Sequence, residues 1–91
     1  MNRRKLNKIK QKVDGFRARG GIKSAELESL AKRLGRVKSD RGKEPTWVSE
    51  QFLSLRPLSI PHHGSGDLNR NTARAILDQL EEDIEKWEEL L

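Results

Sequence analysis

Several residue types are absent or scarce in this chain, and each absence excludes a class of protein. There is no cysteine, which excludes disulfide bonds and thiolate metal sites and leaves the redox compartment undetermined. No apolar run approaches the roughly 18 residues of a membrane-crossing helix, and the basic N-terminus lacks the apolar segment of a secretion signal. We therefore expect a cytoplasmic protein without a membrane partner. Aromatic residues make up 4% of the chain, which argues against a platform for stacking single-stranded bases.

Familiar catalytic and metal-binding motifs are missing as well. The segment Gly64-Ser65-Gly66 predicts a turn, because the spacing and the lysine of a phosphate-binding P-loop are absent. No serine stands in a nucleophile-elbow pattern. The chain has two histidines, and the nearest carboxylate to them is Asp67, so a metal site would lack ligands. We expect neither a metal nor a cofactor.

Charge is abundant, and it is distributed unevenly along the sequence. Residues 1–45 hold 15 lysines and arginines against 5 acidic residues, a net charge of +10, whereas residues 46–91 hold 4 against 9, a net charge of −5. A basic surface attracts polyanions such as RNA, and an acidic surface repels them. The basic half therefore favours polyanion binding over a merely solvated surface.

The 91 residues suit one small domain that follows a basic segment. Residues 1–21 predict a basic arm or short helix, because their apolar residues have near-helical spacing: Leu6, Ile9, Val13 and Phe16. Gly15 and the Gly20-Gly21 pair are expected to break this helix and leave the arm loosely attached. The domain itself is expected over residues 22–91.

Within the domain, the pattern predicts a helix, three strands and a second helix. The first helix is predicted over residues 24–34, with Ser24 as its N-terminal cap and Gly35 as a left-handed C-terminal cap. Extended segments follow over residues 36–39, 46–52 and 55–60, and prolines at both ends of the last one favour an edge position or an early strand end. The last helix is predicted to begin near Asn71. The expected fold class is α+β, in the order helix, three-stranded antiparallel sheet, helix, with both helices covering a single face of the sheet.

The last helix carries an acidic extension from about residue 78. Between Asp78 and Leu91 there are seven acidic residues and one lysine. The apolar stripe of the helix nevertheless continues through this extension and is longer than a three-stranded sheet needs for cover. We expect the stripe to pack, either within the chain or against another molecule.

Short motifs between residues 24 and 80 resemble, in their order and spacing, the HicA-type toxins. The matching pieces are the helix over residues 24–34, the Arg41-Gly42 turn, Trp47 on the middle strand, the segment Ile60-Pro61-His62-His63-Gly64 and the helix over residues 72–77. The resemblance implies a fold like that of a double-stranded RNA-binding domain. It also implies the function of a type II toxin: a metal-independent endoribonuclease that cuts messenger RNA and is held in check by a HicB-like antitoxin.

One position departs from the pattern of that family. Gly42 matches the family glycine and Lys43 replaces the usual serine or threonine, but Glu44 stands where the resemblance places the catalytic histidine. Histidine, with a pKa near 6.5, can take or give a proton, whereas an exposed glutamate near 4.3 is ionised at pH 7 and can act only as a base. The glutamate also places negative charge beside an anionic phosphate. We expect an activity lowered by roughly 10²–10⁴-fold, the scale of losing one proton-transfer group.

His62 and His63 are weaker candidates for the same proton transfer. Adjacent residues in an extended segment point to opposite sides, so the two histidines cannot form a paired site by themselves. A turn whose histidines make hydrogen bonds is the simpler interpretation of this segment.

If RNA is bound, its phosphates and 2′-hydroxyls are the expected partners of the basic residues. The predicted RNA contacts are Lys32, Arg33, Arg36, Lys38, Arg41 and Lys43. Two alternatives remain open at this stage. The chain is either a non-catalytic RNA-binding module that kept the scaffold, or a protein that docks a partner through its acidic C-terminal helix.

Overall fold

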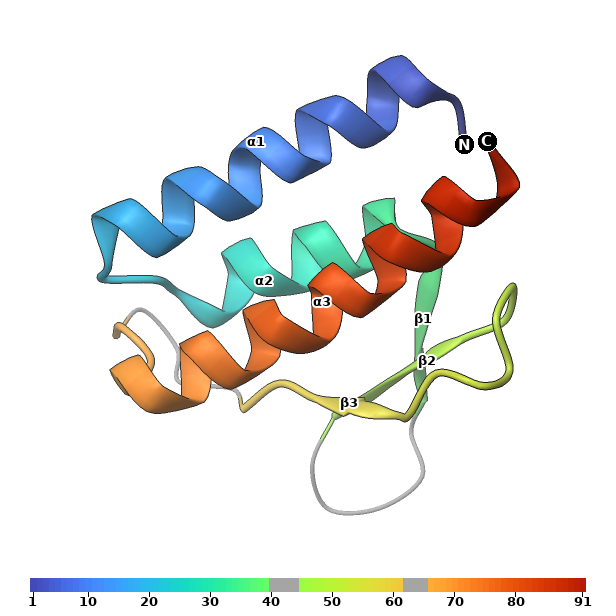
Figure 1. Cartoon of the computed structure of the whole chain (residues 1–91). Coiled ribbons are helices and arrows are strands. Elements are labelled where there is room, and N and C mark those ends of the chain that lie inside the picture. The colour runs from blue at the N-terminus through green and yellow to red at the C-terminus, as the bar shows by residue number, and fades with distance from the viewer. Residues whose placement is uncertain (40–44, 62–65) are drawn as a thin grey trace.

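Three helices and a three-stranded antiparallel sheet make up the described part of the chain (Figure 1). The computed structural model describes residues 1–39, 45–61 and 66–91. The elements, in chain order, are α1 (Arg3–Arg19), α2 (Ser24–Arg33), β1 (Arg36–Ser39), β2 (Thr46–Ser49), β3 (Leu58–Ser59) and α3 (Arg70–Leu90). These helices and the antiparallel sheet confirm the predicted α+β class.

The sheet has the order β1-β2-β3, so that β2 is central and β3 lies at an edge, as the prolines predicted. Val37 pairs with Val48 and Trp47 pairs with Leu58 in the antiparallel register. The strand β1 has its predicted bounds, but β2 is shorter than predicted. It ends at Ser49 because the hydroxyl of Ser49 accepts a hydrogen bond from the backbone N–H of Phe52 at 3.0 Å and turns the chain.

The helix ends follow the expected capping chemistry with small shifts in position. Lys23, not Ser24, is the N-cap of α2, and its backbone N–H donates to Glu26 Oε1 at 3.1 Å. Gly35 has φ +92° directly after α2, which confirms the predicted left-handed cap. The helix α3 starts slightly before the predicted position, because the side chain of Asn69 accepts the first free N–H groups of the helix.

The N-terminal segment is a full helix of the core, and the expectation of a loosely attached arm was wrong. The helix α1 continues through Gly15 and ends only at Gly20. Its apolar side is buried, with Ile9 at 0% exposure, and it packs along α3 so that the two chain ends lie close together (Figure 1). Burial of these side chains outweighs the cost of about 1 kcal/mol for a glycine inside a helix.

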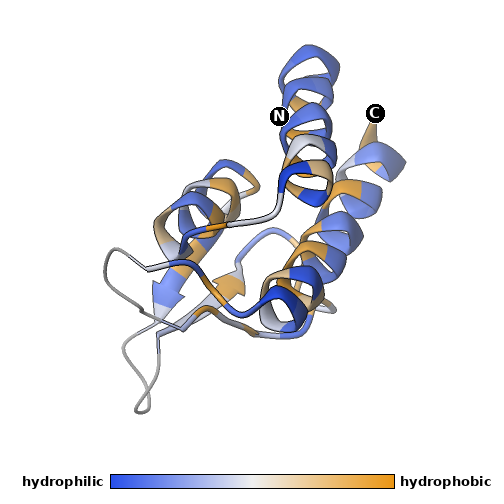
Figure 2. Ribbon diagram, turned by 90° about the vertical axis from the view of Figure 1, so that its left-hand side faces the viewer, coloured by the Kyte–Doolittle hydropathy of each residue, from blue (hydrophilic) through white to orange (hydrophobic). Residues whose placement is uncertain are grey.

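The acidic helix α3 uses its long apolar stripe within the molecule. Leu77, Leu80 and Ile84 are buried in the same core as the apolar residues of α1 and α2. Hydrophobic residues gather on the sides of the helices that face one another (Figure 2). Of the two expected uses of the stripe, packing within the chain is the one observed. In the described ranges, no helix is long and apolar enough to cross a membrane.

Candidate nucleic-acid interface

The predicted catalytic positions lie in the segments that the structure does not describe. Glu44, His62 and His63 fall outside the described residues, and so do the predicted RNA contacts Arg41 and Lys43. The other four predicted RNA contacts belong to α2 and β1 and can be placed.

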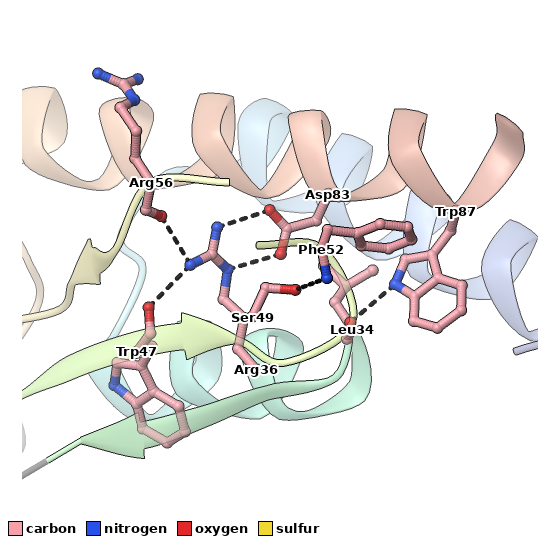
Figure 3. Close-up of polar contacts among 8 residues, drawn as sticks. All are labelled: Leu34, Arg36, Trp47, Ser49, Phe52, Arg56, Asp83 and Trp87. Carbon is pink, nitrogen blue, oxygen red and sulfur yellow. Dashed lines mark hydrogen bonds and ion pairs between the residues drawn. The ribbon is translucent and has the colours of Figure 1, made fainter. Parts of the chain in front are cut away.

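Arg36 is not available for an RNA contact, contrary to our expectation. The residue is 3% exposed, and Nε and Nη2 donate to the two carboxylate oxygens of Asp83 at 2.7 and 2.8 Å (Figure 3). Nη1 donates to the carbonyl oxygens of Trp47 at 2.9 Å and Arg56 at 3.0 Å. All three guanidinium nitrogens are thus engaged inside the fold, and the residue joins the sheet to α3.

Asp83 is the buried acidic partner of Arg36, and its position in the sequence could have predicted that it is buried and paired. It lies three residues after Leu80 and four before Trp87, so that it falls on the apolar stripe of α3, where an acidic residue needs a partner. Its side chain is 1% exposed. Burial raises the pKa of the Asp83 carboxyl above its ordinary value, while the hydrogen bonds and charge of Arg36 act in the opposite direction.

Lys32 and Lys38 come together around Trp47. The ammonium nitrogen of Lys32 lies 5.7 Å from the centre of the Trp47 ring. Lys38 is the cross-strand partner of Trp47, and directly paired residues of an antiparallel sheet project to the same face. Both lysines are exposed, and neither forms an ion pair with another residue that the structure describes. We call Lys32, Lys38 and Trp47 the lysine cluster.

The indole of Trp47 contributes an unusual polar atom to this cluster. Trp47 is 1% exposed, and its Nε1 has no hydrogen-bond partner among the described residues. The second tryptophan differs, because Trp87 Nε1 donates to the carbonyl oxygen of Leu34 at 2.8 Å (Figure 3). A buried donor without a partner costs about 1–3 kcal/mol, and such groups are rare in folded proteins.

Arg33 lies apart from the lysine cluster. It is exposed, as predicted, but it lines a hollow of about 260 Å³ between α1 and α2, together with Lys12 and Phe16. Lys32, its neighbour in the sequence, is directed to Trp47 instead. The four predicted RNA contacts that the structure describes are therefore divided: two share the lysine cluster, one lies on the other side of α2, and one is buried.

Part of the basic charge of α1 is matched by the acidic charge of α3. Lys10 pairs with Glu88 at 3.2 Å, and Arg17 pairs with Asp78 at 2.6 Å and Glu81 at 3.0 Å. The uneven charge along the sequence thus serves helix packing as well as any external partner. Five exposed cations of α1 have no ion pair with a described residue: Arg3, Arg4, Lys5, Lys8 and Lys12.

Neither metal-binding geometry in the described residues nor similarity to known proteins assigns a function to this surface. Within the described ranges, no three histidine, aspartate or glutamate side chains are grouped so as to hold a metal ion. Comparison of the chain with protein-family models, with curated proteins and with solved structures finds no match. The function is therefore inferred from the sequence pattern and the chemistry of the surface.

Proposed function

We propose that this protein binds RNA and is a HicA-like toxin whose endoribonuclease site is weakened by Glu44. The motifs between residues 24 and 80 support this proposal, and so does the order α2-β1-β2-β3-α3. In that part of the chain, α2 packs on β1, α3 packs on β3, and the two helices contact each other (Figure 1). A fold like that of a double-stranded RNA-binding domain has this order of elements, and α1 is added in front of it.

The lysine cluster is the observation that carries the proposal. Two exposed lysines without a carboxylate partner among the described residues lie next to one tryptophan. The Lys32 ammonium is 5.7 Å from the Trp47 ring, and Lys38 is the cross-strand partner of Trp47 in β1, the strand that precedes the segment holding Glu44 in the sequence. Binding of a phosphate group would neutralise these charges and release counter-ions, which is the main source of affinity for nucleic acids. In the sequence, this strand is followed directly by residues 40–44, where the resemblance places the family's catalytic histidine.

The chemistry expected of this site follows from the residue at position 44. Cleavage of RNA without a metal needs a group that takes the proton of the 2′-hydroxyl and a group that protonates the leaving oxygen. An ionised glutamate can serve only the first step. We propose messenger RNA as the substrate class, a HicB-like antitoxin as the protein partner and the cytoplasm as the location, in line with the resemblance.

Cleavage and binding by two variants test this proposal. The chain and its Glu44→His variant are incubated with messenger RNA, with Glu50→His, at an exposed position after β2, as the control for adding a histidine elsewhere. All three proteins should bind RNA, and Glu44→His alone should raise cleavage, by roughly 10²–10⁴-fold. Binding without cleavage by any of them would favour the non-catalytic RNA-binding module. Absence of binding would refute the proposal.

Docking of a partner on the acidic helix is less well supported. The apolar side of α3 is already covered by α1, and Asp78, Glu81 and Glu88 are paired with cations of α1. The large apolar residue that α3 exposes is Leu90, at the end of the helix.

A further inference from the structure

A groove lies where the end of α1 meets the start of α3. It has a volume of about 370 Å³, within the range of pockets that hold small ligands. Its apolar lining includes Ile22, Leu68 and Ala73, and the charged residues among its described lining are four arginines: Arg17, Arg19, Arg70 and Arg74. No carboxylate belongs to the part of the lining that the structure describes, although Asp67 lies nearby against Gly21.

Two of the four arginines are occupied by contacts inside the molecule. Arg17 is bound by Asp78 and Glu81. Arg19 donates to both carboxylate oxygens of Glu26 at 2.9 Å, and its guanidinium lies 4.9 Å from the centre of the Phe16 ring. These contacts fix the shape of one wall of the groove.

The other two arginines differ, because no partner among the described residues occupies their guanidinium groups. Arg70 and Arg74 are exposed, they stand four residues apart in α3, and such residues share one face of a helix. No hydrogen bond or ion pair joins either guanidinium to another residue in the described ranges. Two like charges held side by side without a counter-ion favour an anion between them. Arginine in particular suits phosphate, because its planar fork can donate two parallel hydrogen bonds.

We propose that this groove binds one nucleotide of the RNA, with its phosphate on Arg70 and Arg74. The base or sugar of that nucleotide lies against the apolar lining, which a bare inorganic anion would leave unused. This proposal rests on the proposed function, because it takes RNA as the ligand. The groove depends on α1, which lies outside the part of the chain that resembles the HicA-type toxins, and it is therefore a contact that the resemblance does not imply.

Affinity for a short RNA, measured by fluorescence anisotropy on the full chain, tests the proposal. The Arg70→Ala/Arg74→Ala double variant should lose roughly tenfold or more in affinity, the effect of losing hydrogen bonds to a charged group. The matched control is Arg3→Ala/Arg4→Ala, which removes the same charge from two exposed, unpaired arginines at the other end of α1, and it should lose much less. Arg70→Lys/Arg74→Lys should be intermediate, because the charge remains and the fork is lost.

The outcomes separate this inference from the proposed function. If the wild type binds RNA and the groove variant binds no more weakly than the control, the groove assignment is refuted and RNA binding stands. If the wild type binds no RNA, the proposed function fails.

Amide NMR of the wild type, titrated separately with adenosine monophosphate, adenosine and inorganic phosphate, then tests directly whether the groove binds a nucleotide. Shifts at Gly20, Gly21 and Leu68 that need both the phosphate and the nucleoside support the groove assignment. Equal shifts with inorganic phosphate, or none, overturn it.

Discussion

The guanidinium of Arg36 and the carboxylate of Asp83 form a two-point ion pair that joins the first strand to the last helix across 47 residues of sequence. Both side chains are excluded from water. A buried charge pair of this kind is costly to break, because removal of one member leaves the other charge buried without compensation.

Removal of Asp83 should therefore destabilise the protein strongly. Asp83→Leu is expected to lower the free energy of unfolding by about 3–5 kcal/mol, measured by urea denaturation. The double variant Arg36→Met/Asp83→Leu should recover part of this loss, since no lone charge remains buried. Truncation of the exposed pair Lys10 and Glu88 provides the control and should cost at most about 1 kcal/mol. An equal cost for the buried and exposed pairs would contradict this view of Arg36.

The helix α1 should unfold together with the rest of the molecule. Ile9→Ala creates a cavity at a fully buried position and should cost about 2–5 kcal/mol, as should Leu27→Ala in α2. Both variants are expected to show one cooperative transition in circular dichroism and in tryptophan fluorescence. A loosely attached arm would give a different result: Ile9→Ala would leave the fluorescence transition unchanged.

Two glycines should respond in opposite ways to the same substitution. Gly15 lies inside α1, and apart from its chain neighbours and the adjacent helix backbone an added Cβ would meet no atom within 4 Å, so Gly15→Ala should stabilise the protein by about 0.5–1 kcal/mol. Gly35 has φ +92° at the end of α2, and Gly35→Ala should cost about 1–2 kcal/mol through backbone strain. Thermal denaturation of both variants measures the two effects. A loss of stability in Gly15→Ala would show that the helix needs flexibility at that position.

Glu26 should make a contribution to stability that depends on pH. Hydrogen bonds from Arg19 and from the Lys23 backbone hold the pKa of Glu26 below its ordinary value of 4.5. The contribution is therefore present above that ordinary value and is lost as the pH falls through the lower pKa of the folded state.

Urea denaturation at several pH values measures this effect. Glu26→Gln should be less stable than the wild type at pH 7, by less than about 1 kcal/mol for a pair at the surface, and the difference should disappear in strong acid. In an Arg19→Gln background the difference should be largely absent at every pH. A difference that persists unchanged in acid would contradict the role of the carboxylate.

The parts of the fold that local rules govern could be predicted from the sequence, and the parts that distant contacts decide could not. The bounds of β1, the edge position of β3 and the cap at Gly35 follow from strand propensity, proline and glycine. The attachment of α1 to the core was underestimated. Glycine is a local signal for the end of a helix, whereas the burial of α1 against α3 depends on the whole fold.

The same limit applies to the candidate site. Arg36 was counted as a surface cation because its partner lies 47 residues away, although Asp83 on an apolar stripe was a usable clue. Lys32 and Arg33, both predicted as RNA contacts, are exposed because they lie off the apolar stripe of their own helix. Their separation onto two sides of α2 depends on where Trp47 and α1 lie, which no local pattern reveals. Glu44, His62 and His63 stay predictions, because they fall outside the described residues.

The salt dependence of RNA affinity tests the central claim most directly. For the wild type, the logarithm of the binding constant should fall linearly with the logarithm of the salt concentration, with a slope of about −0.7 for each phosphate contacted on a single strand. Lys32→Ala/Lys38→Ala should make this slope less steep by about 1.4, whereas Lys86→Ala, on the acidic helix, should not change it. A slope near zero for the wild type would contradict RNA binding, and an unchanged slope in the double variant would contradict the lysine cluster as its site.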